Sequence, residues 1–341
     1  MFSQLNNGEN KGFLCMKSLN KNLVKIVELL GDGNYHDGTS IGNHLNITRA
    51  SVWKAIRKLE QYAIPLTSVK GKGYRLTQPL NLLDRQHIKN KLRHRSVELD
   101  ILEKIGSTQD YLKEFITQNK KTRVCIAETQ TQGKGRLSRQ WFSPFGKNIY
   151  LSMLYPFAKD ISELSGLSLV VGLAACQAIE SGADLKGNQL KMKWPNDVLV
   201  SQQKLVGILI EIQAESNGFC QAIIGVGINI NMDESSKKDI QQRWTSLLKI
   251  TGQYQDRNIL CAKLIDSLID YLKRFSLGGL PVFMEEWKKR DYLFNTPISV
   301  ISGNKKQEGI CVGINDQGNL LIEAANKNIL TFFSGDTSLL K

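Results

Sequence analysis

Hydrophobic residues near the start of the chain recur at helical spacing in short segments. The first segment, residues 23–30, ends at two nearby glycines and predicts a helix of that length. A second short helix follows, with Ile41 and Leu45 on its inner face and Thr39 or Ser40 as the expected N-terminal cap. A tight turn then leads into a third segment. The pattern therefore predicts three short helices around a small core.

The third segment, residues 48–62, has one hydrophobic face and an opposite face that is polar and basic. Thr48 is its expected cap, and residues 66–76 predict a hairpin with glycines at its tip. Two helices joined by a turn and followed by a basic hairpin are typical of a winged helix-turn-helix domain, here residues 17–78. The residues expected to contact DNA are Thr48, Arg49, Ser51, Lys54 and Lys58 on the helix and Lys70 and Lys72 on the hairpin. A three-helix packing module with solvated charges is the alternative.

The distribution of charge favours a polyanionic partner for this domain. The chain carries a formal charge of +13, and residues 16–78 hold ten lysines and arginines against four acidic residues. Nearly half of the excess charge therefore lies in less than a fifth of the chain. This placement is more informative than the total, because many basic proteins bind no nucleic acid.

Strand patterns dominate the chain beyond a short proline-containing linker at residues 78–83. Strand-like segments are 97–105, 123–128, 149–155, 190–194, 198–200, 204–213 and 222–230, and a mostly apolar helix covers 164–179. Several strands are consecutive and joined by tight turns, which favours a mixed, largely antiparallel sheet backed by helices over a doubly wound parallel sheet. Four more short strands are predicted at 297–301, 307–314, 320–323 and 329–333.

Cysteine content and hydropathy narrow the class of protein. The six cysteines are scattered without a C-x-x-C pair, so we expect reduced, mostly buried thiols of a cytoplasmic protein rather than zinc ligands. No apolar run approaches the roughly 20 residues of a membrane span. We expect no membrane contact. Residues 1–16 lack the pattern of a signal peptide and are interpreted as a disordered tail.

Two glycine-containing segments are candidates for binding anions. Residues 106–109, GSTQ, follow a strand and open a helix, where backbone N–H groups suit anionic ligand atoms, although a plain helix cap is the alternative. In residues 129–141, TQTQGKGRLSRQW, glycines alternate with Lys134 and Arg136, and Arg139 follows. The loop lacks the Walker A pattern and has few hydrophobic anchors, so it is predicted to be mobile without ligand. A solvated surface loop is its alternative.

Two further segments place polar residues at the ends of strands. In residues 193–197, KWPND, the proline interrupts the strand, which makes Asp197 a candidate Mg²⁺ ligand and Asn196 a candidate phosphate contact. In residues 204–211, KLVGILIE, Lys204 enters an otherwise apolar strand and Gly207 allows a ligand near the backbone. A plain lysine at a strand start is the alternative.

Together, the four segments resemble the biotin protein ligases in order and spacing. The strongest pieces are GKGR followed by WFSPFGKNIYLSM, then KWPNDVLV and KLVGILIE, and finally GVGIN. With the N-terminal domain, the resemblance extends over roughly residues 17–340 to the bifunctional bacterial members that also repress the biotin operon. It implies an α+β chain with a class II synthetase-like mixed-sheet catalytic domain at residues 84–292 and an SH3-like barrel at residues 293–341.

The resemblance also implies roles for individual residues. Biotin would contact Ser107, Thr108, Gln109, Gln130, Gly133, Lys134, Gly135, Arg136, Lys204 and Gly207. ATP would contact Arg139, Trp141, Asn196, Asn229 and Trp244, with Asp197 as Mg²⁺ ligand and with Lys204 and Arg136 as catalytic residues. Two positions depart from the family pattern: Lys134 stands where arginine is usual, and Ser138, preceded by Leu137, stands where glycine is frequent.

The implied activity is an ATP-dependent, AMP-forming ligation. Biotin and ATP would form biotinyl-5′-AMP, and biotin would then pass to a lysine of the biotin carboxyl carrier protein of acetyl-CoA carboxylase. The adenylate would also act as corepressor, promoting a homodimer that binds operator DNA of biotin synthesis genes. A lipoate protein ligase, and a ligand-sensing transcription factor without ligase activity, are the alternatives.

Overall fold

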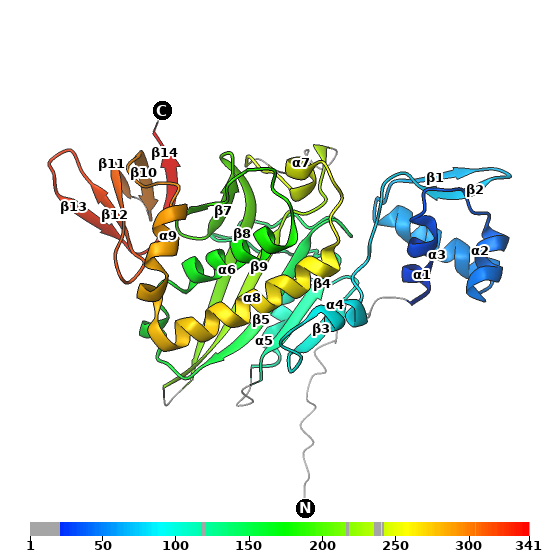
Figure 1. Ribbon diagram of the computed structural model, residues 1–341, viewed down its shortest axis with the longest axis horizontal. Helices are drawn as coiled ribbons and strands as arrows, with labels where there is room; N and C mark the ends of the chain where they lie inside the picture. The colour runs from blue at the N-terminus through cyan, green and yellow to red at the C-terminus, as the bar shows by residue number, and fades with distance from the viewer. Residues whose placement is uncertain are drawn as a thin grey trace, which may run out of the picture.

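The computed structural model describes residues 21–116, 121–215, 218–234, 240, 242–303 and 305–340. The predicted tail, residues 1–16, lies outside this range, as does Cys15. Figure 1 shows three parts in chain order: a small N-terminal unit of helices with a hairpin, a large body in which helices cover a sheet, and a strand-rich C-terminal part. The chain is therefore of the α+β class, as predicted.

The N-terminal unit has the winged helix-turn-helix arrangement that the sequence predicts. Its elements are α1 (Lys21–Leu30), α2 (Gly38–Leu45), α3 (Arg49–Gln61), β1 (Leu66–Val69) and β2 (Gly73–Leu76). Thr48 caps α3 by accepting a hydrogen bond from the Ser51 amide, as expected. The expected cap of α2 is wrong: Asp37 accepts from the amides of Thr39 and Ser40 at 2.9 and 3.0 Å, because both of these residues already lie inside the helix.

A seven-stranded sheet forms the central body. Its strands lie in the order β3-β4-β5-β9-β8-β7-β6, with β3 and β4 parallel and every other pair antiparallel. This confirms the predicted mixed, largely antiparallel sheet. The strands are β3 (Glu98–Leu102), β4 (Arg123–Ala127), β5 (Ile149–Phe157), β6 (Lys191–Lys193), β7 (Asp197–Val200), β8 (Gln203–Glu215) and β9 (Phe219–Ile228).

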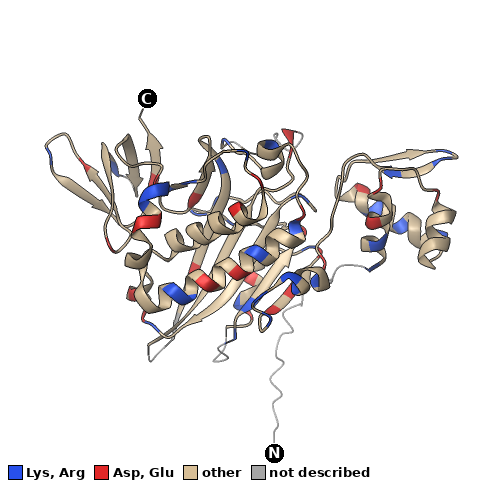
Figure 2. Ribbon diagram, viewed as in Figure 1, with Lys and Arg blue, Asp and Glu red and all other residues tan. Residues whose placement is uncertain are grey.

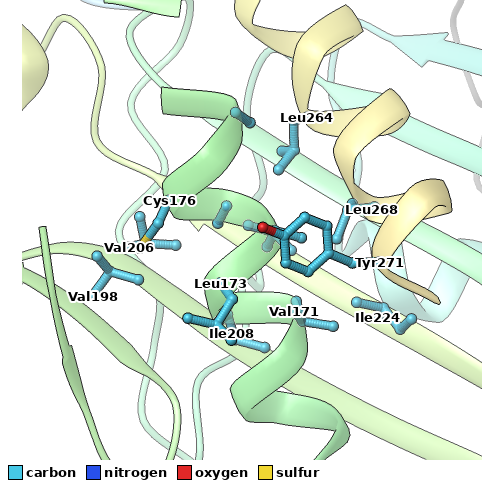
Figure 3. Packing of buried hydrophobic residues seen from close by; sticks show 14 of the residues in the cluster. Val171, Leu173, Cys176, Val198, Val206, Ile208, Ile224, Leu264, Leu268 and Tyr271 are labelled. Carbon is cyan, nitrogen blue, oxygen red and sulfur yellow. The ribbon is translucent and has the colours of Figure 1, made fainter. Parts of the chain in front are cut away.

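Two long helices cover one face of this sheet. Figure 1 shows α6 (Leu167–Gly182) and α8 (Arg257–Gly278) running side by side across the strands. Figure 3 shows side chains from α6 and α8 meeting those of the strands in one packed core. The smaller helices are α4 (Arg85–Lys91), α5 (Thr108–Lys113), η1 (Ile161–Leu164), α7 (Leu247–Thr251), η3 (Leu280–Phe283) and α9 (Met284–Arg290). None of the helices in the described ranges combines the length and the hydropathy that a membrane span requires.

Alternation along the strands separates the two faces of the sheet. On β8 and β9, Val206, Ile208 and Val226 enter the core with α6 and α8, while Gly207 and Gly227 face the other way. A smaller apolar cluster covers part of that second face. In it, Leu112 of α5 packs against apolar residues of β4, β5 and β9. All five described cysteines are free and buried, as expected of structural thiols.

The C-terminal part is a five-stranded antiparallel sheet in the order β13-β12-β11-β10-β14. Its strands are β10 (Pro297–Ser302), β11 (Lys305–Ile314), β12 (Leu320–Glu323), β13 (Ile329–Phe332) and β14 (Asp336–Leu339). The first four match the predicted segments. β14 was not predicted, because its four residues, DTSL, contain a single apolar side chain and give no alternating pattern.

A fully buried ion pair joins the parts of the body that are far apart in sequence. Arg257, at the start of α8, contacts Glu128 at 2.7 Å, and neither side chain is exposed. The Arg257 guanidinium also donates to the carbonyls of Asn148 and Asn81, and Glu128 accepts from the Leu83 amide. Burial opposes the charge on Arg257, but Glu128 outweighs it and raises the pKa of the guanidinium. The pair therefore fixes α8, the interdomain linker and the end of β4 together.

Removing one partner of this pair should destabilise the fold strongly. In Arg257→Met the Glu128 carboxylate stays buried without its counter-charge, so the free energy of unfolding should fall by about 3–5 kcal/mol in a urea titration. Arg93→Met is the matched control, because Arg93 pairs with Asp270 at the surface and should contribute less than about 1 kcal/mol. A loss in Arg257→Met no larger than in the control would contradict this role.

Candidate functional site

A cavity of about 800 Å³ opens on the sheet face opposite α6 and α8. Its walls come from β5, β8 and β9, the start of α5, the 129–141 loop, the KWPND segment and β14. Fourteen of the sequence-predicted site residues line it: Thr108, Gln109, Gln130, Lys134, Gly135, Arg136, Arg139, Trp141, Asn196, Asp197, Lys204, Gly207, Asn229 and Trp244. Four segments that are distant in sequence thus meet at one cavity.

Three glycines of β8 and β9 leave room for other side chains at the bottom of this cavity. A Cβ on Gly227 would lie 2.4 Å from the Trp141 indole, and a Cβ on Gly207 would lie 2.5 Å from it. A Cβ on Gly225 would meet the Gln109 amide at 2.9 Å. The ring of Trp141 packs against the backbone at Gly207 and Gly227, and a larger side chain at either position would displace it.

The start of α5 is held by an internal hydrogen-bond network. The Thr108 amide donates to the Gln130 side chain at 2.9 Å, and the hydroxyls of Thr108 and Ser152 are 2.7 Å apart. The Gln109 side-chain amide donates to the Leu209 carbonyl at 3.1 Å. Ser107 caps α5 from a buried position and does not line the cavity. This segment is both a helix cap and a cavity wall.

The cationic loop has partners that sequence reasoning missed. Lys134 contacts Asp110 at 2.6 Å, and Arg139 forms an ion pair with Asp336 of β14. Arg136 donates to the Asn196 side chain and to the Gly335 carbonyl, each at 3.3 Å. The loop was expected to have few anchors. That expectation concerned hydrophobic anchors, and the contacts found here are polar. They join the loop to α5, to the KWPND segment and to the C-terminal sheet, through residues too distant in sequence to be paired in advance.

Within this loop, two residues adopt an unusual backbone conformation. Leu137 and Ser138 have φ values of 53° and 58°, the left-handed region that favours glycine. Such residues cost on the order of 1–3 kcal/mol each unless the surroundings hold them. Ser138 is the position where the family pattern has glycine, so the backbone there keeps the conformation that glycine adopts freely. Near the start of the loop, the Gly133 carbonyl accepts from the Trp141 amide at 2.9 Å, and Gly133 does not line the cavity.

Burial and neighbouring charges shift the pKa values of two residues around the cavity, Asp110 and Lys193. Burial raises the pKa of Asp110, but hydrogen bonds from Lys134 and Lys113 outweigh it and hold that pKa below its usual value. Burial lowers the pKa of Lys193, which lines the cavity beside Asp197. The cavity wall is therefore rich in cations whose charges are balanced by nearby carboxylates.

Lys204 lies at the centre of the polar wall. Its Nζ contacts Asp197 Oδ1 at 2.8 Å and lies 5.4 Å from the centroid of the Trp141 ring. Asp197 begins β7, which follows a cis Trp194–Pro195 peptide, and pairs in register with Gly207 of β8. The Asn229 side-chain amide is 3.4 Å from the Lys204 carbonyl. An ammonium and a carboxylate thus face the cavity as a partly buried pair.

Metal-binding capacity in the described ranges is limited. No group of three or more His, Cys, Asp or Glu side chains gathers there to hold an ion. Two aspartates of the described residues line the cavity, Asp197 and Asp336, and Asp336 is paired with Arg139. So few carboxylates suit a metal that takes its other ligands from a substrate.

The N-terminal unit presents most of the predicted DNA contacts to solvent. Thr48, Arg49, Lys54, Lys70 and Lys72 are exposed, and Figure 2 marks the basic residues of this unit. Ser51 is half-buried. Lys58 departs from the predicted surface, because it pairs with the buried Glu103 of the central body. Its charge is therefore directed to the domain junction.

Sequence reasoning missed two exposed residues on α3. Trp53 is 52% exposed, and the Arg57 guanidinium lies 5.3 Å from the centroid of its ring. These two residues could have been identified from the sequence, because an aromatic and a basic residue four positions apart lie together on one side of a helix.

Comparisons with known proteins agree with this arrangement. A family model described as Biotin/lipoate A/B protein ligase family matches residues 101–229. A model described as HTH domain matches residues 22–75, and one described as Biotin protein ligase C terminal domain matches residues 293–340. The order of the three matches follows the three parts of the structure.

Relatives share most of the length of the chain. It is 38% identical over 301 residues to the Bifunctional ligase/repressor BirA of Salmonella typhimurium, covering 88% of this chain and 92% of that protein. The protein of the same name from Escherichia coli gives the same values. A solved structure described as biotin protein ligase from Aquifex aeolicus in complex with biotin and ATP aligns with a TM-score of 0.59 and 30% identity, covering 72% of this chain and 99% of that one. The chain belongs to the biotin protein ligase family, among its bifunctional ligase/repressor members.

Proposed function

We propose that this chain joins biotin to ATP to form biotinyl-5′-AMP and then transfers biotin to a lysine of the biotin carboxyl carrier protein. The observation that carries the proposal is the convergence of Lys204, Arg136 and Lys134 on one cavity. Both reacting groups, a carboxylate and a phosphate, are anionic. Bringing them together requires cations more than it requires a base.

In the first step, a carboxylate oxygen of biotin attacks the α-phosphorus of ATP, and pyrophosphate leaves with the electrons of the broken P–O bond. Lys204 orients the carboxylate by replacing its contact with Asp197, and Arg136 stabilises the charge that develops on the phosphate. In the second step, the carrier's ε-amine attacks the anhydride carbonyl, AMP leaves and the amine loses a proton. Neither step requires an enzyme nucleophile.

The site residues divide between the two substrates. Biotin would be held by Ser107, Thr108, Gln109, Gln130, Gly133, Lys134, Gly135, Arg136, Lys204 and Gly207, and ATP by Arg139, Trp141, Asn196, Asn229 and Trp244. Since Ser107 and Gly133 lie behind the cavity wall, we infer that they act by holding their neighbours. The loop over the cavity would shield the reactive anhydride from water.

Mg²⁺ is part of this proposal. Asp197, a partly buried carboxylate at the cavity, has the oxygen chemistry that the ion prefers, and the phosphates would provide most of the remaining ligands. When bound, the ion supplies neutralisation of phosphate charge.

DNA binding would follow from the N-terminal unit. A single helix-turn-helix offers few base contacts, so we propose a ligand-promoted homodimer on a symmetric operator of biotin synthesis genes. Biotinyl-5′-AMP would act as corepressor, and consumption of the adenylate by unmodified carrier would release the DNA. ATP, carrier and operator all place this activity in the cytoplasm.

Biotin-dependent exchange between ATP and pyrophosphate tests the proposed function. Exchange should require biotin, and lipoate should neither replace biotin nor compete with it. Exchange that depends on lipoate would favour a lipoate ligase, and a chain that shows none would favour a ligand-sensing regulator without ligase activity.

Lys204→Ala should remove most of the adenylate formation. Because the variant loses the cation that faces the biotin carboxylate, its rate of exchange should fall by about 10²-fold or more while its circular dichroism stays unchanged. Lys191→Ala is the control, since Lys191 lies on β6, the edge strand of the same sheet, and outside the cavity. Near-normal exchange in Lys204→Ala would mean that its assigned role is wrong.

Operator affinity should depend on ligand and on salt. A duplex selected from a random library with biotin and ATP present should bind more tightly with the adenylate and more weakly after unmodified carrier is added. The logarithm of the binding constant should fall linearly with the logarithm of salt concentration, and Lys72→Ala should reduce the slope by about 1. An affinity for the operator duplex that does not change when biotin and ATP are added, at fixed salt concentration, would contradict the corepressor role.

A further inference from the structure

One glutamine lies at the junction between the DNA-binding unit and the catalytic body. Gln78 follows β2 by two residues and uses both ends of its amide. Its Nε2 donates to Asp233 Oδ2 at 2.9 Å, and its Oε1 accepts from Lys147 Nζ at 2.8 Å. A linker residue thus bridges two segments that are 69 and 155 residues away in the chain.

The two bridged segments lead directly to the cavity. Lys147 lies between the cationic loop and β5, and Asp233 follows the end of β9 by five residues. The two segments also contact each other, because the Asn231 amide donates to the Lys147 carbonyl at 2.8 Å. Burial lowers the pKa of Lys147, so its ammonium depends on the acceptors around it. Gln78 is one of these acceptors.

A short series of hydrogen bonds continues from this bridge to Lys204. The neighbouring Asn148 is fully buried and accepts from the Ile230 amide at 2.9 Å. The Asn148 side-chain amide donates to Asn229 Oδ1 at 3.4 Å. The Asn229 side-chain amide in turn donates to the Lys204 carbonyl at 3.4 Å. The position of Asn229 at the cavity therefore depends on the segment that Gln78 holds.

Other contacts seat the DNA-binding unit on the same region. The Tyr62 ring stacks on Phe145 with centroids 4.0 Å apart and an interplanar angle of 3°. The Tyr62 hydroxyl donates to Glu103 at 2.7 Å, and Lys58 pairs with the same carboxylate. Glu103 precedes the GSTQ segment, and Phe145 follows the cationic loop. The unit thus rests on the ends of the segments that form the cavity, which leaves Gln78 little freedom to move.

We propose that Gln78 is a positioning residue for the nucleotide part of the cavity, acting through Lys147, Asn148 and Asn229. The inference rests on the proposed ligase function and extends it to a residue outside the cavity. Glutamine suits this position because one end donates and the other accepts. A carboxylate there would repel Asp233, and alanine would leave both partners without this bridge.

Exchange kinetics test this role. In Gln78→Ala, the KM for ATP in biotin-dependent exchange should rise roughly 5- to 10-fold, the effect of one or two lost hydrogen bonds, while kcat changes less than about twofold. Gln86→Ala is the matched control, because the Gln86 side chain bonds to Asn90 within its own helix, and its KM should stay at the wild-type value.

Swapping the hydrogen-bond donor and acceptor between residues 78 and 233 distinguishes a positioning role of Gln78 from general destabilisation of the fold. Gln78→Glu alone should raise the KM at least as much as Gln78→Ala. Adding Asp233→Asn should restore most of it, because the new amide can donate to the new carboxylate, which still accepts from Lys147. An unchanged KM in Gln78→Ala, or no recovery in the double variant, overturns the inference alone. A wild-type chain without biotin-dependent exchange overturns the proposed function and this inference with it.

Discussion

The buried contact between Arg257 and Glu128 is the constraint on which the site depends. Two opposite charges with no exposure are stable only when each keeps its partner and its hydrogen bonds. The hydrogen bonds of Arg257 reach Asn81 in the linker and Asn148 just before β5. Glu128 accepts from the Leu83 amide and directly precedes the cationic loop. The pair therefore joins the base of the cationic loop to the linker that carries the DNA-binding unit.

The catalytic cavity follows from the alternation of the strands on this frame. One sheet face is filled by branched side chains against α6 and α8, and glycines at alternate positions empty the other face. Around the emptied face, three cations are each paired with a carboxylate: Lys204 with Asp197, Lys134 with Asp110, and Arg139 with Asp336. Anionic groups of biotin and ATP would compete for the same cations. We therefore propose that substrates bind by exchanging one set of ion pairs for another, which would limit the cost of holding positive charge there beforehand.

Local patterns in the sequence predicted the winged helix-turn-helix unit, the mixed sheet and the segments that meet at the cavity, because each depends on spacing within a few residues. Contacts between distant residues could not be predicted in this way. Asp336 lies 197 residues from Arg139, and the place of Trp141 against Gly207 depends on how the loop folds back over the sheet. For the same reason Lys58 was assigned to DNA, whereas tertiary packing directs it to Glu103. The cap of α2 was predicted wrongly for a local reason, since Asp37 lies two residues before Thr39, the first residue considered as a cap.

Mass spectrometry of a biotin carrier domain is the most direct test of whether this chain attaches biotin to a carrier lysine. The domain would be incubated with the chain, ATP, Mg²⁺ and biotin, and with each component omitted in turn. One biotinyl group should appear on a single lysine of the carrier, and only in the complete mixture. An unmodified carrier in that mixture, with the chain folded and ATP in excess, would contradict it.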